Sequence, residues 1–393
     1  SAMHKLWLFS VLNSVLSVLV LSDESTTLFP TNLMKHETKW LVKALEQAHY
    51  NKVSIESLDA ATFLDRYLEK LDKQKLYFKK AEVEAIKSKF SPTLIALFQQ
   101  GNLFPGFEIY NQYKSLSLQR MDWALDYLDD IPDLHSKQKY YSDRTEMDWE
   151  KTDSHLDETW KKLITSEFLN ETLSQLDLNS SSPIEEDGYP DLLEESREIL
   201  VKRYKRWKKN IMEFESGDVQ ELYLTTFTQM FDPHTTFMNI KEKEKFDQAM
   251  NNEFVGIGAV LSDVDGYCTI KELLPGGPAE ASRELEPEDI ILKVAQSEGS
   301  FVDVVDMKLS KIVDLIKGPK DTLVRLEIRP GSNPKTSKVV GIVRDKIKLT
   351  ANLASGKVFE VRHNESVRML GVVELPSFYG STGDGHKATD DVE

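Results

Sequence analysis

The stretch NNEFVGIGAVLS, residues Asn251–Ser262, places Gly256 and Gly258 one residue apart, directly before an apolar run. Two kinds of site need bare backbone in such a position: a loop that cradles a phosphate, and a loop whose N–H groups hold the terminal carboxylate of a peptide. A phosphate loop leads into a helix and carries a third glycine or a Lys-Ser/Thr pair. Here the loop leads into the run Ala259–Leu261, which is typical of a strand, so the sequence argues against nucleotide binding.

The elements predicted after this loop favour a carboxylate site. The strand Gly258–Ser262 would offer an open edge to which a peptide could add as one more strand. A helix predicted from Val305 to Ile316 would form the opposite wall of the groove. We therefore predict a peptide-binding site that consists of Gly256, Ile257, Gly258, Ala259, Val260, Leu309, Ile312 and Val313. An ordinary tight turn at residues 256–259 remains the alternative.

The period of apolar residues changes near Phe254 and divides the chain into two kinds of structure. Upstream, from His36 to about Lys245, the period is helical. Downstream, turn signals separate short strands, predicted at Val255–Leu261, Tyr267–Lys271, Asp289–Val294, Leu323–Arg329, Lys357–Arg362 and Met369–Leu375. A second, shorter helix is predicted at Ala279–Glu284. The fold class is therefore α+β and multidomain, with a mostly helical N-terminal domain.

Three details of the helical region are open to direct comparison with a structure. The first helix is predicted to place Trp40 on its apolar face, together with Leu41, Ala44, Leu45 and Ala48. Another helix is predicted to begin at Ser91-Pro92 and to stop at Gly101. The polar segment Asn179–Asp191 is predicted to be an exposed loop.

Composition narrows the class of protein. The chain has 393 residues, 40% of them hydrophobic, which is enough for two or three folded domains. The net charge of −16 argues against a general binder of nucleic acid or anionic membranes. Cys268 is the only cysteine, and its strand-like neighbours predict a buried, inert thiol.

The N-terminus carries a sorting signal. Ser1-Ala2 ahead of Met3 is typical of residues left by an expression tag, and a basic start then precedes an apolar run from Leu6 to Leu21. The run is interrupted by polar residues and is short for a membrane span, so we predict a secretory signal peptide, with an uncleaved anchor as the alternative. Either one places the remaining chain outside the cytoplasm.

Segments along nearly the whole chain resemble the tail-specific proteases, the C-terminal processing serine proteases of bacterial envelopes. Four of them resemble the PDZ domain of that family: Phe254–Leu261, Pro275–Ser282 (PGGPAEAS), Glu286–Val294 (EPEDIILKV) and Leu315–Ile328 (LIKGPKDTLVRLEI). Three resemble its helical N-terminal region: Leu45–Tyr50 (LEQAHY), Phe63–Phe78 and Phe231–Met238 (FDPHTTFM). The segment Gly371–Gly380 (GVVELPSFYG) is similar to the strand that opens its protease core.

The resemblance implies a serine endopeptidase with a Ser–Lys dyad and with no metal or organic cofactor. The family recognises apolar, flexible C-terminal tails; its PDZ domain binds the tail and gates the active site. The segments that carry the dyad, one like Ser-Ala-Ser-Ala-Ser-Glu and one like Phe-Gly-Lys-Gly, do not occur before Glu393. No catalytic residue is therefore assigned, and the chain is expected to be a truncated form that is inactive alone.

The resemblance also implies a domain plan and partners. We predict a signal region at 1–22, a helical N-terminal domain at 23–245, a PDZ domain at 246–345 and the incomplete start of a protease domain at 346–393. The expected location is the periplasm, and the expected ligands are C-terminal tails of protein substrates. An adaptor protein on the helical domain and a homo-oligomer are compatible with this plan; nucleic acid is not, and membrane contact is confined to the signal segment.

The sequence gives little support for other chemistry, but it leaves two other classes of protein open. Asp232 and His234 are better explained as a turn than as a catalytic pair, Ser355 and Lys357 match no motif of the family, and the eight histidines show no metal-ligand spacing. Two non-enzymatic hypotheses remain open. One is a PDZ scaffold or adaptor that collects protein C-termini, and the other is a helical assembly module with a vestigial PDZ domain.

Overall fold

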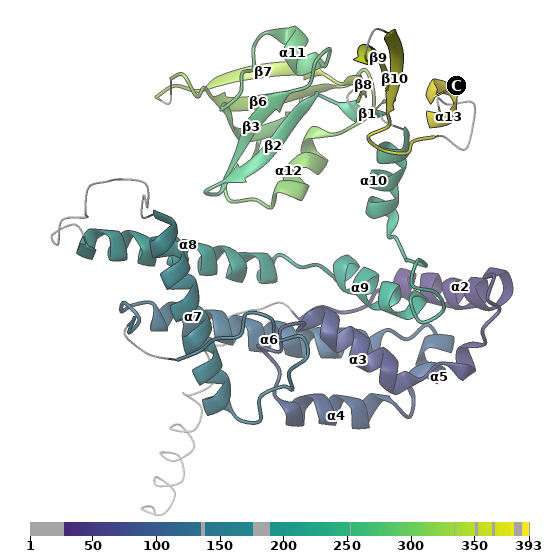
Figure 1. Ribbon diagram of the computed structural model, residues 1–393, viewed down its shortest axis with the longest axis vertical. Helices are drawn as coiled ribbons and strands as arrows, with labels where there is room; N and C mark the ends of the chain where they lie inside the picture. Colours follow the sequence, from purple (N-terminus) through teal and green to yellow (C-terminus); the bar gives the residue numbers. More distant parts are fainter. Residues whose placement is uncertain are drawn as a thin grey trace, which may run out of the picture. The chain divides into compact units, whose positions relative to one another are not determined.

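The computed structural model describes residues 27–134, 138–175, 189–251, 253–333, 335–349, 353–363, 366–380 and 387–392. The chain divides into two compact units, Ser1–Asn239 and Ile240–Glu393 (Figure 1). The first is helical and the second is built on antiparallel strands, so the fold is α+β and multidomain, as predicted. The predicted signal segment lies outside the described residues. None of the helices in the described ranges is both long enough and apolar enough to cross a lipid bilayer.

The described part of the first unit is helical throughout. Its elements are α2 (Asn32–Ala48), the 3-10 turn η1 (Ile55–Ser57), α3 (Ala60–Leu71), α4 (Lys80–Phe90), α5 (Leu94–Gln99), α6 (Phe104–Tyr127), α7 (Asp153–Gln175), α8 (Tyr189–Met212) and α9 (Ser216–Thr228). Local chemistry sets several of their ends. The Asp59 carboxylate accepts the N–H groups of Ala61 and Thr62 and so begins α3.

Aromatic side chains fill the interior of this unit. Phe63 of α3 makes edge-on contacts with Phe98 and Tyr223, and Phe98 stacks on Phe227. These rings belong to one buried cluster, and a second cluster forms around Trp160 between α6, α7 and α8. Most of the aromatic residues on these helices therefore belong to the helix core.

Trp40 is an exception, and its predicted position is wrong. Its side chain is 72% exposed, whereas the buried residues of α2 are Thr38, Val42 and Leu45. These three lie four and three residues apart, which defines the stripe that faces the core. Trp40 lies two residues after Thr38, about 200° around the helix, and therefore faces outward.

The other two details of this region are corrected in part. Ser91 ends α4 and the next helix, α5, begins only at Leu94, because Pro92 has no N–H to continue a helical bond. The predicted stop is right: Gly101 has φ +69°, and a Cβ there would lie 2.3 Å from the Lys35 carbonyl oxygen. The helix α8 begins at Tyr189, inside the predicted loop, and residues 179–188 of that loop lie outside the described residues.

The second unit follows the predicted order of strands closely. It contains α10 (Ile240–Asn251), β1 (Glu253–Gly256), β2 (Ala259–Val264), β3 (Tyr267–Leu273), α11 (Pro278–Ser282), β4 (Ile290–Gln296), β5 (Val302–Asp303), α12 (Leu309–Ile316), β6 (Leu323–Arg329), β7 (Lys338–Val343), β8 (Asp345–Lys348), β9 (Ser355–His363), β10 (Ser366–Glu374) and α13 (Ala388–Val392). The main sheet has the order β2-β3-β4-β6-β7, with β5 paired to β4. Its core includes Ile270, Ile291, Ile312 and Leu326, so α12 packs on this sheet.

Two predicted elements are modified in the structure. The strand predicted at Val255–Leu261 is broken at Ile257 and Gly258, because β1 pairs with β8 whereas β2 pairs with β3. The helix predicted from Val305 begins only at Leu309, because Asp306 has φ +59° and its N–H donates to the Gly266 carbonyl.

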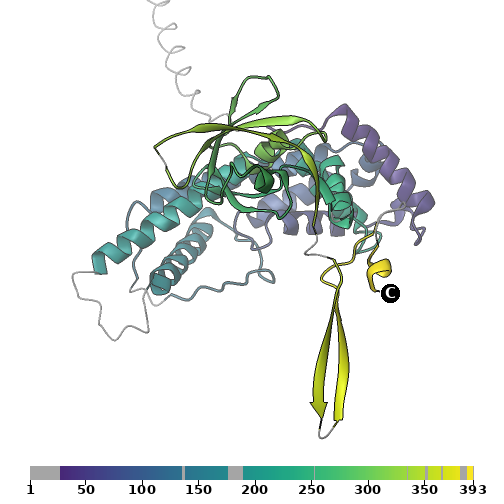
Figure 2. The ribbon, with the colours of Figure 1, turned by 90° about the horizontal axis from the view of Figure 1, so that it is seen from above.

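The remaining strands, β9 and β10, form a two-stranded sheet of their own (Figure 2). Both were predicted, and the short helix α13 follows them. The pairing of β1 with β8 joins residue 256 to residue 345 and continues past it, across the predicted boundary at 345/346. The domain limits of the sequence analysis stay a prediction.

Candidate functional site

The strand β2 is an edge of the main sheet. Within the described residues β3 is its neighbour on one side, and no other strand pairs with its second side. The helix α12 packs beside β2. An edge strand next to a helix is the arrangement that accepts an extended peptide as an added strand.

The loop before β2 is held through its carbonyl groups. The Ile257 carbonyl accepts the Ala279 N–H at 2.7 Å, and the Gly258 carbonyl accepts the Leu274 N–H at 2.8 Å. In a trans peptide the N–H of the next residue points opposite to the carbonyl. The N–H groups of Gly258 and Ala259 therefore both point away from the turn formed by residues 274–279, toward the open side of β2.

Hydrogen-bond partners agree with this geometry. Among the described residues, no backbone or side-chain acceptor takes the N–H of Ile257 or Gly258. The Leu274-to-Gly258 bond makes Ala259 and Leu273 a non-hydrogen-bonded pair of the β2–β3 ladder, so the Ala259 N–H also faces outward. Adjacent N–H groups that point to one side can hold an oxygen anion.

The two glycines of this loop differ. Gly258 has φ +79°, and a Cβ on it would lie 3.0 Å from the Cα of Gly277 in the neighbouring turn. Gly256 has no positive φ, and a Cβ there would lie 3.4 Å from the Phe254 ring. Bare backbone is thus required at Gly258, where the turn that holds the loop approaches most closely.

The three predicted helix residues divide into two groups. The Ile312 side chain is fully buried in the core that α12 shares with the main sheet. Leu309 and Val313 are half-buried and lie one turn apart, so they share a face of α12. Their side chains are only partly covered by the rest of the unit.

On β2 the side chains alternate as in any strand. Ala259 and Leu261 pack toward the core, whereas Val260 is 41% exposed. The backbone groups of Val260 face its register partner Glu272 on β3, so the open edge here is provided by Ala259, and the Val260 side chain points away from the Ala259 face. Leu261 was not among the predicted residues, although the period of two that placed Ala259 would also have placed it.

A second residue missed by the sequence analysis is Arg344, which is buried between β7 and β8. Its Nε donates to the Ile316 carbonyl at 2.7 Å, Nη1 to Thr322 Oγ1 and Nη2 to Gln296 Oε1. Burial lowers the pKa of this guanidinium. Arg344 thereby joins the C-terminal end of α12 to Asp345, the register partner of Gly256. No sequence signal distinguishes it from an ordinary surface arginine.

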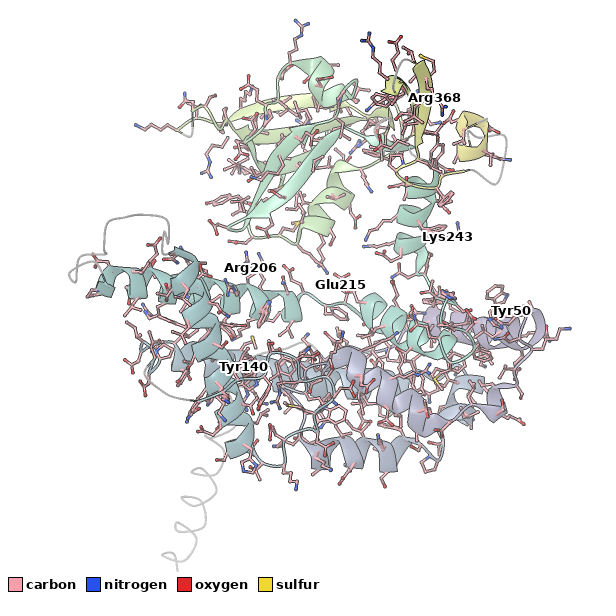
Figure 3. All side chains as sticks on the ribbon, in the orientation of Figure 1. Tyr50, Tyr140, Arg206, Glu215, Lys243 and Arg368 are labelled. Atoms are coloured by element: carbon pink, nitrogen blue, oxygen red, sulfur yellow. The ribbon has the colours of Figure 1, made fainter. Side chains whose placement is uncertain are left out.

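The structure explains the residues that could have indicated a different catalytic site. The Asp232 carboxylate accepts the backbone N–H of His234 at 2.8 Å, as in a turn, and also the hydroxyl of Tyr50, a residue labelled in Figure 3. Cys268 is buried, and burial raises the pKa of its thiol to about 12. Ser355 and Lys357 are exposed at the start of β9, and no described hydrogen bond joins them.

An edge strand beside a helix, opened by a loop whose N–H groups face outward, defines a PDZ-type peptide-binding module placed after a helical domain. Comparison with known families agrees. The family profile described as "Tail specific protease N-terminal domain" matches residues 41–241, and that described as "PDZ domain" matches residues 245–329. The chain belongs to the tail-specific protease family.

Relatives share different parts of the chain. A tail-specific protease of Haemophilus influenzae is 30% identical over 351 residues, which are 89% of this chain and 48% of that protein. The carboxy-terminal processing protease CtpA of Bacillus subtilis is 35% identical over 97 residues, 25% of this chain and 20% of that protein. A solved PDZ domain of a carboxy-terminal protease from Vibrio cholerae, in complex with a peptide, is 46% identical and covers 25% of this chain and 99% of its own, with a TM-score of 0.24. The chain spans about half the length of the Haemophilus relative.

Proposed function

We propose that this chain is the substrate-recognition portion of a tail-specific serine protease and binds the free, apolar C-termini of proteins. The observation that supports the proposal most directly is the loop at residues 256–259. The carbonyls of Ile257 and Gly258 accept N–H groups of the 274–279 turn, so the N–H groups of Gly258 and Ala259 face the open edge of β2. A terminal carboxylate is the group that such donors would hold.

In this proposal the tail adds to β2 as an antiparallel strand. Backbone bonds provide affinity with little dependence on sequence, and the apolar side chains provide the preference. The last side chain of the tail would contact Leu309 and Val313 on α12 and Ala259 on β2. Arg344 is proposed to keep α12 at the right distance from the loop, because it bonds the last turn of that helix.

Fluorescence anisotropy with two versions of one apolar-ended peptide tests the carboxylate. The free acid is expected to bind, and the C-terminal amide to bind about tenfold to a hundredfold more weakly, because a charge-assisted hydrogen bond contributes about 1.5–3 kcal/mol. Equal affinities for the acid and the amide would exclude the loop as a carboxylate site. No binding of either would favour the hypothesis of a vestigial PDZ domain.

A pair of variants on α12 tests the groove wall. Val313→Asp places a charge on the half-buried face and is expected to weaken binding of the free acid about tenfold or more. Ser310→Asp adds the same charge at an exposed position of the same helix and is expected to change little. Equal losses in the two variants would mean that charge, and not the wall, determines the affinity.

We propose further that recognition, and not bond cleavage, resides in residues 1–393. The serine- and lysine-containing segments that the family resemblance implies do not occur in this sequence. Incubation with an apolar-tailed protein is expected to give no cleavage. Cleavage that serine-directed reagents abolish would refute this point, and a native stop codon directly after Glu393 would favour the scaffold hypothesis.

A bacterial envelope location, in the periplasm, is part of the same proposal, since the relatives named above are bacterial and the N-terminal segment resembles a signal peptide. N-terminal sequencing of the protein recovered from a periplasmic extract would test it. A protein that stays with the cytoplasmic fraction would contradict it. An adaptor on the helical domain and a homo-oligomer remain proposals without a supporting contact.

A further inference from the structure

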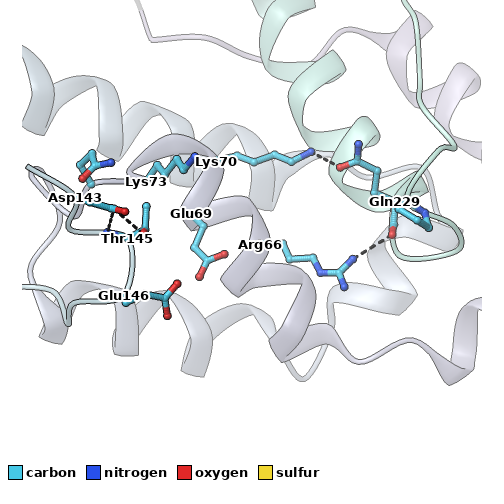
Figure 4. Close-up of a pocket in the computed structure, with 10 residues that line it drawn as sticks. Arg66, Glu69, Lys70, Lys73, Asp143, Thr145, Glu146 and Gln229 are labelled. Atoms are coloured by element: carbon cyan, nitrogen blue, oxygen red, sulfur yellow. Dashed lines mark hydrogen bonds between the residues drawn. The ribbon is translucent and has the colours of Figure 1, made fainter.

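The helical unit contains an open hollow of about 1030 Å³ that the proposed tail-binding groove does not use (Figure 4). It lies between α3, the segment 143–146 that precedes α7, and the end of α9. Its lining is polar and mostly charged, in contrast to the aromatic interior of the same unit. Because its lining comes from three separate segments, two of them charged, the hollow is a product of the fold and not of one helix surface.

One wall of this hollow, the segment 143–146, is neither helix nor strand, and buried polar groups hold it in place. The buried Asp72 carboxylate accepts three consecutive backbone N–H groups, those of residues 76–78, and the indole N–H of Trp149 at 3.1 Å. The Lys75 ammonium donates to the Thr145 carbonyl at 2.6 Å, and the Arg144 guanidinium donates to the Gln74 carbonyl and to Glu150. Burying a charged side chain costs free energy unless hydrogen bonds compensate it. These bonds can form in only one position of the segment 143–146, so they specify that position. The hollow is therefore preformed.

One end of the hollow is positively charged. Arg66 and Lys70 lie one turn apart on α3; Nη1 of Arg66 donates to the Gln229 carbonyl at 3.1 Å, and Nζ of Lys70 donates to Gln229 Oε1 at 2.6 Å. Both acceptors are neutral oxygens of a single residue. Burial and the neighbouring charge of Arg66 lower the pKa of Lys70. Two cations held against a neutral residue form a site that an added carboxylate would stabilise.

The other end carries acidic groups. Asp143 and Glu146 lie at the end away from Gln229, with Glu69 between the two ends (Figure 4). The Asp143 carboxylate already accepts the N–H and the hydroxyl of Thr145, whereas Glu146 is exposed. Lys73 also lines this end, beside Asp143 (Figure 4), so the hollow presents Arg66 and Lys70 at one end and three carboxylates with one further cation toward the other. A purely acidic ligand would be repelled by Glu69 and Glu146.

We propose that this hollow binds a polypeptide segment of a partner protein that offers a carboxylate side chain to Arg66 and Lys70 and a cationic side chain to Glu146. A guanidinium and an ammonium that both donate to Gln229 suit a carboxylate, and the exposed Glu146 suits a lysine or an arginine. An extended segment of mixed charge matches both the size and the polarity of the hollow. No free C-terminus is required, so this site is distinct in chemistry from the groove beside β2.

The test uses the whole chain and a short labelled peptide that is acetylated and amidated, with Glu in one half and Lys in the other. The blocked ends keep the peptide out of a carboxylate loop, so failure here is distinguishable from failure of the proposed tail binding. Saturable binding by fluorescence anisotropy is expected, with weaker binding at higher salt. The double variant R66Q/K70Q is expected to lower the affinity about tenfold or more, because both charge-assisted bonds are lost.

A matched double variant controls for net charge. K35Q/K43Q also removes two positive charges, from exposed positions of α2 that do not line the hollow, and is expected to bind the peptide as the unchanged protein does. Unchanged far-UV circular dichroism shows that both variants are folded. Absence of saturable binding, an equal loss in the control, or equal affinity for a peptide that contains Lys but no Glu would overturn the proposal.

Discussion

At Gly258 both the backbone conformation and the neighbouring chain require a residue without a Cβ. Its φ is +79°, and the Gly277 Cα lies where a Cβ would need room. The two glycines at positions 256 and 258 are therefore not equivalent, although they are indistinguishable in the sequence. The close approach matters for the proposed carboxylate site because the same turn holds the carbonyls that orient the outward N–H groups.

The first prediction compares these two glycines. Gly258→Ala is expected to lower the free energy of unfolding of the second unit by about 1–3 kcal/mol and to weaken binding of a free-acid tail, because the strained loop must shift. Gly256→Ala is expected to have a smaller effect on both, since its added methyl group meets the Phe254 ring only at contact distance. Urea denaturation and anisotropy measure the two quantities. A larger effect at Gly256 would contradict the assignment.

Cys268 is expected to be chemically unreactive in the folded protein. Its side chain is 1% exposed on β3, and burial raises the pKa of the thiol to about 12, so almost no thiolate is present near neutral pH. A thiol reagent such as Ellman's reagent is expected to leave the folded protein unlabelled at pH 8 and to label one thiol in denaturant. Rapid labelling of the folded protein would show that β3 opens easily.

At the scale of elements, Arg344 fixes the end of α12. Arg344→Met would leave the Ile316 carbonyl, Thr322 Oγ1 and Gln296 Oε1 without their donor, and the expected loss of stability is about 2–4 kcal/mol. Tail affinity is expected to fall as well, because Ile316 ends the helix that carries the groove wall. Lys320→Met removes an exposed cation that pairs with Asp345 and is expected to change the stability little, because solvent screens an exposed ion pair. Similar losses in the two variants, by urea denaturation, would contradict a special role for Arg344.

The segment before α7 depends on Asp72, and its stability should depend on pH. Burial raises the pKa of the Asp72 carboxyl above its value in the unfolded chain, about 3.9, despite the N–H groups that donate to it. Between these two pKa values the folded state binds more protons than the unfolded state, so the free energy of unfolding falls as pH rises through that window. Asp72→Asn cannot titrate. The difference in free energy of unfolding between the unchanged protein and Asp72→Asn is therefore expected to decrease as pH rises from about 4. An increase would show that the pKa of Asp72 is lowered, and not raised, by folding.

Elements with a clear apolar period were predictable from the sequence, and those set by tertiary contacts were not. The strand β6 alternates cleanly and β3 and β4 contain short apolar runs, whereas β7 was missed because Gly341 interrupts its apolar run and a polar segment precedes it. The start of α12 was placed too early because the bond from Asp306 to Gly266 is invisible in the sequence. The loop at 256–259 and the wall of α12 were located from the order of elements, but the role of these residues in binding stays a prediction. Arg344 was missed because only the folded chain brings it to Ile316.

For the molecule as a whole, each unit has a core of its own. The clusters around Phe63 and Trp160 are confined to the first unit, and the cluster around Ile270, Ile291 and Leu326 is confined to the second. Large buried cores that share no residue allow each unit to fold separately. The two proposed binding sites then reside in different units and should be separable.

We therefore predict that two fragments, residues 27–239 and 240–348, fold independently and divide the two binding activities between them. The second fragment omits β9 and β10, which pair only with each other among the described residues and expose apolar side chains such as Val358 and Met369. Each fragment is expected to unfold in one cooperative urea transition. The mixed-charge peptide is expected to bind the first fragment and the free-acid tail the second, with affinities close to those of the whole chain. A fragment that lacks a cooperative transition would show that its core depends on the other unit, whereas folded fragments that lose either ligand would place the corresponding site across both.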